Sequence, residues 1–229
     1  MKHKLVVTSI CDRFFATMPK TAAITDILHK WGYDYRPYVD LLWYGWPSKV
    51  YYYTDYVKTL LGEATHIMFI DSSDVVLLCG PDELMERWAA FDHPWVYNAE
   101  PHIWPPNSFT PEDYPTPMVN NRYINGGAYI GEVEHVAYWY DQWTQTPIVC
   151  EKSDQHWMAE RFLKHWPDAI KLDTNCDLFQ CMCGNDWNVT VTPGHLHNNM
   201  TGTDPAVIHF NGGTDITALD RRGLWDCLI

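Results

Sequence analysis

The sequence lacks a long hydrophobic run and the dense, regular cysteine spacing of small secreted domains. No stretch approaches the roughly 18 apolar residues of a membrane-spanning helix. The apolar run in residues 1–10 is too short for the hydrophobic region of a signal peptide, and it fits a β-strand better. The cysteine count of seven is odd, which argues against a disulfide framework. We therefore expect a soluble, cytoplasmic protein with no membrane partner.

Positive charge is also scarce, with 16 basic residues against 29 acidic ones and a formal net charge of −13. The broad cationic surface of a nucleic-acid-binding protein is therefore absent, although a local basic strip is still compatible with this composition. Aromatic residues are abundant at 15% of the chain. Their flat faces stack on sugars and nucleobases, and many also fill the core. The length of 229 residues predicts a single domain over residues 1–229.

Apolar strand patterns alternate with helical periodicity along the chain, which predicts an α/β fold. We expect a Rossmann-like, mostly parallel central sheet with helices on both faces, and ligands at the carboxyl edge of its strands. A loop over residues 100–121 holds six prolines and is long enough to be functional. The predicted strands span residues 5–10, 66–70, 75–78, 95–98, 123–131, 170–172, 189–192 and 207–210, and the predicted helices span residues 21–31, 49–61, 81–91, 133–143 and 153–166.

Asp71 and Asp74 lie three residues apart in a turn between two apolar strands. Two carboxylates in such a place cannot both be buried without partners, because the desolvation penalty is large. A divalent cation would satisfy both, and oxygen ligands suit magnesium or manganese. Bound to a diphosphate, the cation would neutralise the charge that develops on the leaving group. The alternative is an ordinary turn whose aspartates cap backbone groups.

Two further motifs lie at strand ends or within strands. His209 ends an apolar strand, and as a third ligand its imidazole would favour manganese over magnesium. A core histidine with a satisfied hydrogen bond is the alternative. Gly126 and Gly127 interrupt another strand pattern, which indicates either close approach of a ligand or a β-bulge. Asn125 beside them is able to bond sugar hydroxyls.

The order and spacing of these motifs resemble the glycosyltransferase domain of the lysyl hydroxylases (procollagen-lysine dioxygenases), a nucleotide-sugar transferase of GT-A type. The resemblance runs from about residue 6 to residue 213 and rests on six motifs in the family's order. They are Asp71-Ser72-Ser73-Asp74-Val75 with the helix after it, Ala99-Glu100 with Trp104-Pro105, Tyr114-Pro115 with the block from Arg122 to Gly131, Asp154-Gln155, Phe179-Gln180, and His209-x-Asn211-Gly212.

The resemblance implies a role for each matching residue. Manganese would hold the diphosphate of UDP, and a carboxylate near the reacting centre would serve either as base for the acceptor hydroxyl or as a stabiliser of positive charge on the sugar. The implied metal ligands are Asp71, Asp74 and His209; the implied nucleotide and cofactor contacts are Thr8, Lys49, Ser73, Trp104, Asn211 and Gly212; and the implied catalytic residues are Asp154, Asn125 and Glu100. Asp154 also fits a simpler role, as a carboxylate at a helix N-terminus.

The sequence departs from the family pattern at several positions. Ser73 stands where the family usually has tyrosine, which puts stacking on uracil in doubt. Asp215 stands where a phosphate-binding lysine is expected, and the family's run of aspartates is reduced to Ser153-Asp154-Gln155. No His-x-Asp or His-x-Glu of an iron facial triad occurs, so hydroxylation is not expected of this chain.

We therefore expect an enzyme that transfers glucose or galactose from a UDP-sugar to a hydroxyl-bearing acceptor, with manganese, or magnesium in its place. The resemblance implies hydroxylysine or galactosyl-hydroxylysine of a collagen-like protein as acceptor. A compact form without a secretory signal also fits a virus or a bacterium, where a hydroxymethylated base of viral DNA is an alternative that the acidic charge disfavours. A non-catalytic nucleotide-sugar or glycan-binding protein is the alternative from another class. A zinc site made of Cys176, Cys181, Cys183, His195 and His197 is a separate hypothesis.

Overall fold

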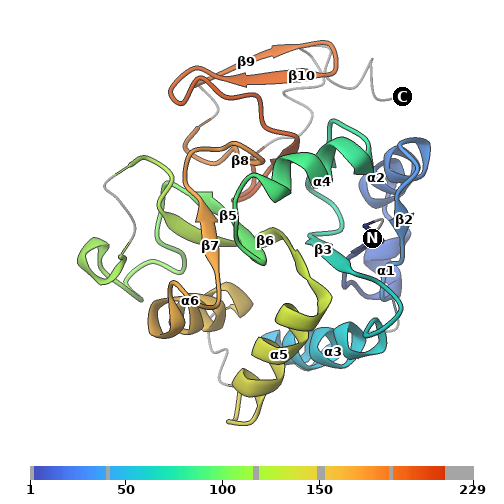
Figure 1. Cartoon of the computed structure of the whole chain (residues 1–229), viewed down its shortest axis with the longest axis vertical. Helices are drawn as coiled ribbons and strands as arrows, with labels where there is room; N and C mark the ends of the chain where they lie inside the picture. The colour runs from blue at the N-terminus through green and yellow to red at the C-terminus, as the bar shows by residue number, and fades with distance from the viewer. Residues whose placement is uncertain (1–2, 40–41, 116–118, 149–152, 186–187, 215–229) are drawn as a thin grey trace.

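A computed structural model describes residues 3–39, 42–115, 119–148, 153–185 and 188–214, so the prediction about Asp215 lies outside the described residues. A six-stranded sheet in the order β2-β1-β3-β6-β5-β7 forms the centre of the fold (Figure 1). Its strands are Asp34–Tyr35 (β2), Leu5–Thr8 (β1), His66–Ile70 (β3), Tyr123–Glu132 (β6), Trp95–Glu100 (β5) and Lys171–Asp173 (β7). Strand β6 runs antiparallel to both of its neighbours, and the other pairs are parallel.

Helices cover both faces of this sheet, as the sequence predicts. On one face lie Trp46–Thr59 (α3), Val133–Thr144 (α5) and Asp154–His165 (α6), and on the other lie Pro19–Lys30 (α2) and Pro81–Ala89 (α4). Alternate residues of β3 point to opposite faces, so Ile67 packs in the core under α3 and α5, whereas Met68 packs in the core under α2 and α4. Both faces are buried, which explains why β3 is apolar after its first residue, His66.

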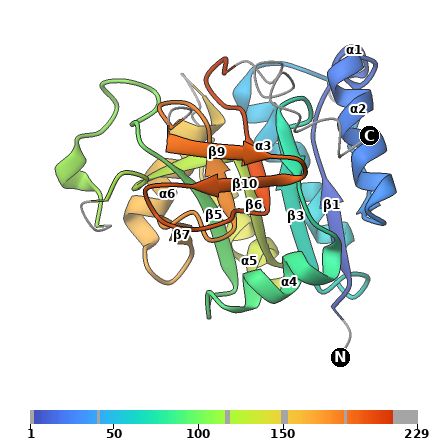
Figure 2. The same ribbon diagram turned by 90° about the horizontal axis from the view of Figure 1, so that it is seen from above.

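A second, three-stranded sheet lies on the α2–α4 side, in the order β4-β11-β8. Its strands are Val75–Leu77 (β4), Val207–His209 (β11) and Phe179–Cys181 (β8). Strand β11 is antiparallel to β4 and parallel to β8. A hairpin of Val189–Thr192 (β9) and His195–Asn198 (β10) lies beyond β8 at one end of the molecule, and Figure 2 shows it from above. Two short elements complete the fold, the helix Arg13–Ala16 (α1) and the 3₁₀ helix Pro111–Asp113 (η1).

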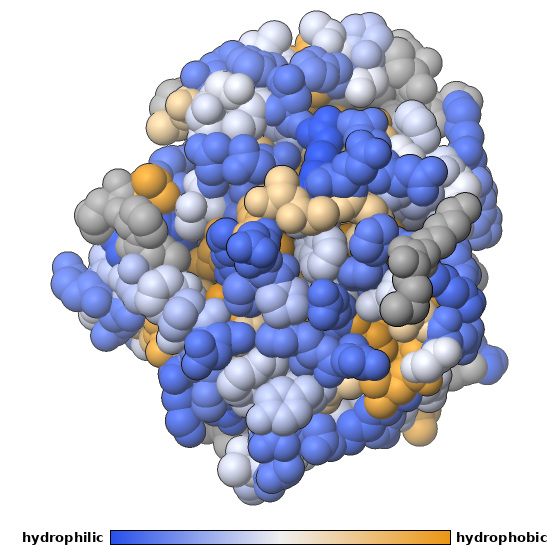
Figure 3. Space-filling model, viewed as in Figure 1, coloured by the Kyte–Doolittle hydropathy of each residue, from blue (hydrophilic) through white to orange (hydrophobic). Residues whose placement is uncertain are grey.

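The predicted α/β class is confirmed, and each predicted helix and strand is present within a few residues of its expected bounds. The predictions missed α1, β2, β8, β10 and the second sheet. The face in Figure 3 is mostly hydrophilic, with apolar side chains in small separate areas. None of the described helices is long and apolar enough to cross a membrane.

Candidate active site

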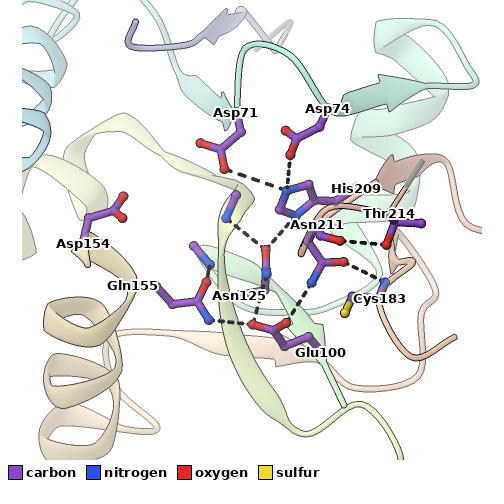
Figure 4. A network of polar contacts seen from close by, with 12 residues as sticks. Asp71, Asp74, Glu100, Asn125, Asp154, Gln155, Cys183, His209, Asn211 and Thr214 are labelled. Atoms are coloured by element: carbon purple, nitrogen blue, oxygen red, sulfur yellow. Dashed lines mark hydrogen bonds and ion pairs between the residues drawn. The ribbon is translucent and has the colours of Figure 1, made fainter. Parts of the chain in front are cut away.

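The acidic turn and the C-terminal end of β11 lie side by side (Figure 4). Asp71 follows the last residue of β3, and Asp74 precedes the first residue of β4. His209, the last residue of β11, pairs with Val75 across the antiparallel ladder, and the Phe210 amide donates to the Asp74 carbonyl at 2.8 Å. The backbone register of the second sheet therefore fixes the imidazole beside both carboxylates.

The side chains of Asp71, Asp74 and His209 form a candidate metal site, with their ligand atoms all within 4.8 Å of one another. His209 Nε2 lies 3.8 Å from Asp71 Oδ2 and 3.5 Å from Asp74 Oδ2. On the other side of the buried ring, Nδ1 lies 2.8 Å from Asn125 Oδ1. An amide oxygen only accepts, so Nδ1 carries a proton and Nε2 faces the carboxylates.

The electrostatics of this group favour a positive charge between the three side chains. Burial lowers the pKa of His209, but the hydrogen bond to Asp74 and the charges of Asp74 and Asp71 outweigh it, so the pKa ends above its ordinary value. Burial raises the pKa of the Asp71 carboxyl, and Lys49 partly opposes this rise. Asp74 Oδ1 is buried with no hydrogen-bond partner among the described residues, which is costly for a carboxylate oxygen. Two carboxylates with one imidazole are a donor set that fits a divalent cation such as manganese.

Lys49 links the candidate metal site to the start of α6. Its ammonium lies 3.0 Å from Asp71 Oδ1 and 2.6 Å from Asp154 Oδ2. Burial lowers the pKa of Lys49, but the charges of Asp154 and Asp71 outweigh it and raise the pKa, so this lysine stays protonated. The Lys49 ammonium thus pairs with the carboxylates of Asp71, after β3, and of Asp154, at the start of α6.

The position of Asp154 follows from where α6 begins. Ser153 is the N-cap, and its hydroxyl accepts the His156 amide at 3.0 Å. Asp154 is therefore the first helical residue, as the sequence predicts, and its carboxylate lies near the positive end of the helix dipole. The ion pair with Lys49 directs it toward Asp71.

A buried carboxylate, Glu100 at the end of β5, holds three amide side chains together. Its Oε1 accepts from Asn125 Nδ2 at 3.1 Å and from Gln155 Nε2 at 2.5 Å, and its Oε2 accepts from Asn211 Nδ2 at 2.8 Å. Burial raises the pKa of Glu100, and the hydrogen bonds from Gln155 and Asn125 partly offset this. The carboxylate joins β5, β6, α6 and the segment after β11, beside the candidate metal site.

Strand β6 bulges where it carries Asn125 and the two glycines. Tyr97 pairs with Tyr129 and Ala99 with Ile124, so four residues of β6 lie opposite one residue of β5. Asn125 Oδ1 accepts the Gly127 amide at 3.0 Å as well as His209 Nδ1. A Cβ on Gly127 would lie 2.0 Å from His209 Cε1. Of the two alternatives for the glycines, the β-bulge is present, and the group closest to the Gly127 backbone is His209; close approach by a ligand stays a prediction.

The structure gives the other predicted residues varied surroundings. Thr8 is fully buried, and its hydroxyl donates to the Arg36 carbonyl at 2.9 Å. Trp104 is 54% exposed in the loop after β5, and neither it nor Thr8 takes part in the hydrogen bonds and ion pairs around the acidic turn and Glu100. Ser73 is partly exposed in the acidic turn. Gly212 has φ +65°, and a Cβ there would lie 2.8 Å from Cys183 Sγ.

Gln155 belongs to this network, although the sequence analysis names it only within the Asp154-Gln155 motif and gives it no role. Its Oε1 accepts the Gly126 amide at 3.0 Å while its Nε2 donates to Glu100, so it connects α6 to the β6 bulge. Its position directly after Asp154, in the first turn of a predicted helix, was the available signal.

The hypothesis of a zinc site with cysteine ligands is wrong for the described part of the chain, where no metal-binding group contains a cysteine. Cys176 and Cys181 are buried, and the Cys176 thiol accepts a hydrogen bond from Asn121 Nδ2 at 3.0 Å. Strand β8 places Cys181 inside the second sheet, while His195 and His197 are on the hairpin, where they approach Asp204 instead.

Comparison with solved structures defines the class of fold. A structure described as a glycosyltransferase involved in the glycosylation of the major capsid of PBCV-1 matches with a TM-score of 0.53, covering 94% of this chain and 97% of that chain. The two sequences are 10% identical, so the similarity concerns the fold, which is α/β and GT-A-like.

Comparison with family models is more specific, because the model of the PLOD GT domain matches residues 44–222. The chain belongs to the PLOD GT domain family, and it is a glycosyltransferase by that membership. The expected resemblance is confirmed.

Curated relatives include two kinds of protein. The procollagen-lysine,2-oxoglutarate 5-dioxygenase of Drosophila melanogaster is 33% identical over 159 residues, which cover 65% of this chain and 21% of the relative. The procollagen-lysine,2-oxoglutarate 5-dioxygenase 1 of Mus musculus is 31% identical over 157 residues, covering 66% and 21%. The uncharacterized protein R699 of Acanthamoeba polyphaga mimivirus is 28% identical over 148 residues, covering 64% and 31%. The chain thus matches between a fifth and a third of the length of these relatives.

Proposed function

We propose that this glycosyltransferase moves glucose or galactose from a UDP-sugar to an acceptor hydroxyl, with manganese held by Asp71, Asp74 and His209. The observation that supports this most directly is the convergence of these three side chains at the carboxyl ends of β3 and β11. Magnesium is the alternative cation. The bound cation would supply charge neutralisation at the diphosphate leaving group.

Lys49 and Asp154 are the proposed groups beside the reacting atoms. Asp154 Oδ2 is ion-paired with Lys49, which leaves Oδ1 as the oxygen that faces a substrate. There it either accepts the proton of the acceptor hydroxyl or stabilises positive charge on the sugar. Lys49 keeps its charge and lies next to Asp71, so it is placed to contact a phosphate of the donor.

Glu100 and Asn125 are better assigned to positioning than to direct contact with the sugar. Both oxygens of Glu100 accept amide hydrogen bonds, and Asn125 uses its amide on Glu100, Gly127 and His209. The exposed Trp104 is available to stack on a sugar ring. Thr8, Ser73, Asn211 and Gly212 remain the proposed nucleotide contacts.

Hydroxylysine or galactosyl-hydroxylysine of a collagen-like protein is the proposed acceptor. The support comes from the relatives, which include procollagen-lysine dioxygenases. The matched region is a minor part of those proteins, so this proposal concerns the transferase step alone.

A UDP-release assay tests the proposed donor and metal together. Purified protein is incubated with a panel of UDP-sugars, with and without manganese, and free UDP is measured. We expect manganese-dependent release from UDP-glucose or UDP-galactose, and loss of release in Asp74→Ala. Asp82→Ala, an exposed aspartate in α4, is the matched control and should behave like the wild type. If no UDP-sugar of the panel released UDP, and UDP plus manganese gave no thermal shift, the proposal would be contradicted.

The role of Asp154 has its own test. Asp154→Asn should lower kcat by roughly 10²- to 10⁴-fold, the usual contribution of a general acid or base, with little change in affinity for UDP plus manganese. An unchanged kcat would assign Asp154 to helix stabilisation alone.

A further inference from the structure

A second group of metal-ligating side chains lies on the hairpin, away from the acidic turn. It consists of His195 and His197 of β10 and Asp204 of the loop before β11, and its ligand atoms all lie within 4.8 Å of one another. His195 and His197 are two residues apart on one strand, so their side chains project from the same face. We name this group the hairpin triad.

The Asp204 carboxylate of the hairpin triad lies near both imidazoles, at one distance that suits a tetrahedral metal shell and at one hydrogen-bond distance. Asp204 Oδ1 lies 3.2 Å from His195 Nε2 and 2.6 Å from His197 Nδ1. With metal–ligand bonds of about 2.0–2.1 Å, neighbouring ligand atoms of tetrahedral zinc are about 3.3 Å apart. The first distance already fits, and the second needs an adjustment of about 0.7 Å, which a small rotation of a half-exposed side chain provides.

The backbone around the hairpin triad is held in place from two sides. The Asn198 amide donates to the Thr203 carbonyl at 2.8 Å, which brings the loop back against the end of β10. On the other side, Arg87 of α4 donates to the main-chain carbonyl of Asp204 while its guanidinium pairs with Glu83 at 2.6 Å. The loop is therefore fixed through its main chain, and the Asp204 carboxylate is directed to the two histidines.

The accessibility of the three side chains suits an ion that enters from solvent. Their exposed fractions are 51% for His195, 39% for His197 and 48% for Asp204. Three protein ligands and an open fourth position for water are sufficient for zinc. Two imidazoles favour zinc or a similar transition metal over magnesium or calcium, which prefer oxygen ligands only.

We propose that the hairpin triad binds zinc, or a transition metal of similar preference, as a site separate from the Asp71–Asp74–His209 group. Metal bound there links the β9–β10 hairpin to the loop that leads into β11. The inference does not depend on the proposed transfer reaction, because none of the three ligands belongs to the candidate active site.

Calorimetric titration with zinc, on protein freed of metal by a chelator, tests this directly. The Asp74→Ala variant is the background, since it disables the other candidate site. We expect it to bind one equivalent of zinc, and His197→Ala in the same background to bind at least tenfold more weakly. His29→Ala, which removes an exposed histidine of α2, is the matched control and should leave zinc binding unchanged.

A second measurement guards against a folding defect in the histidine variant. Asp204→Asn keeps the side-chain size and removes the charge, and it should abolish the rise in Tm that zinc gives the Asp74→Ala protein. The proposal is overturned if Asp74→Ala protein binds no zinc. It is equally overturned if the His197→Ala, Asp204→Asn and His29→Ala variants bind zinc alike.

Discussion

The imidazole of His209 lies so close to the backbone of Gly127 that no side chain fits between them. A Cβ on Gly127 would be 2.0 Å from His209 Cε1 and 2.6 Å from Nε2. The φ angle of Gly127 is not in the left-handed region, so it is space that requires glycine here. Strand β6 thus packs directly against the imidazole of His209, the candidate metal ligand.

Gly127→Ala should displace His209 and abolish manganese-dependent UDP release, with a loss of about 1–3 kcal/mol in unfolding free energy from overpacking. Gly126→Ala is the matched control, because a Cβ there would lie 3.4 Å from Gln155 Cβ, a contact that a small shift relieves. Turnover assays and urea unfolding of both variants check this. Equal activity in the two would mean that the imidazole position is not essential.

Glu100→Gln should lower stability by about 1–3 kcal/mol, since an amide group would face amide donors that now bond to a carboxylate. It should also weaken manganese binding, because Asn125 orients His209 and is itself held by Glu100. The measurements are urea unfolding and the thermal shift given by UDP plus manganese. Glu86→Gln, at an exposed position of α4, should stay within about 0.5 kcal/mol of the wild type. Wild-type behaviour of Glu100→Gln would refute the positioning role.

Lys49→Met should abolish turnover, because Asp71 and Asp154 would then lack the cation that holds them. Lys58→Met on the same helix is the control, since Lys58 pairs with Asp141 at 2.6 Å on the surface, between side chains that are 41% and 47% exposed. Such surface pairs contribute about 0–1 kcal/mol, so the control should remain stable and active. Steady-state kinetics of both variants decide the point. If Lys49→Met retains wild-type kcat, the lysine is a structural cation only.

His66 predicts acid sensitivity of the fold. Burial lowers its pKa to about 4 from the usual 6.5, with a smaller effect of His3. In the unfolded chain His66 therefore binds a proton near pH 6.5, whereas in the folded chain it binds one only near pH 4. The contribution of neutral His66 to stability is thus present above pH 6.5 and declines as the pH falls toward 4. At pH 5 the decline amounts to about 2 kcal/mol. Urea unfolding at pH 7.5 and pH 5 should show that acidification is less destabilising, by about 2 kcal/mol, in His66→Gln than in the wild type or in His29→Gln. If His66→Gln and the wild type lost the same stability between pH 7.5 and pH 5, the assignment of this loss to His66 would be wrong.

The acidic turn and the end of β11 were predictable because local patterns mark both. An apolar run that stops at Asp71 indicates a buried strand ending at the sheet edge, and the same holds for the run before His209. The meeting of the two ends was not predictable from these patterns, because His209 reaches the acidic turn through the antiparallel pairing of β11 with β4 in the second sheet.

The function of Glu100 was not predictable in the same way. Its partners Gln155 and Asn211 lie 55 and 111 residues away in sequence, and only the packing of α6 and β11 against the central sheet brings them together. Local patterns indicate that a carboxylate follows a buried strand, but they do not show which amides it meets.

The elements that the predictions missed are short or polar. Strand β2 has two residues, too few for a periodic pattern. Strand β10 reads His-Leu-His-Asn, with Leu196 as its only apolar residue, because one face of the hairpin is open to solvent. The antiparallel direction of β6 was also outside the reach of local patterns, since it depends on how the chain crosses the sheet.

The place of β11 in the second sheet has a consequence for the order of synthesis. Strand β11 lies between β4 and β8, and it is the last of the described strands to leave the ribosome. A growing chain that has reached β10 already contains Asp71, Asp74 and Glu100, yet it lacks the imidazole and the Asn211 amide. The candidate metal site is therefore assembled only when the final strand closes the second sheet, so a chain interrupted before residue 207 has two aspartates in a turn and no imidazole beside them.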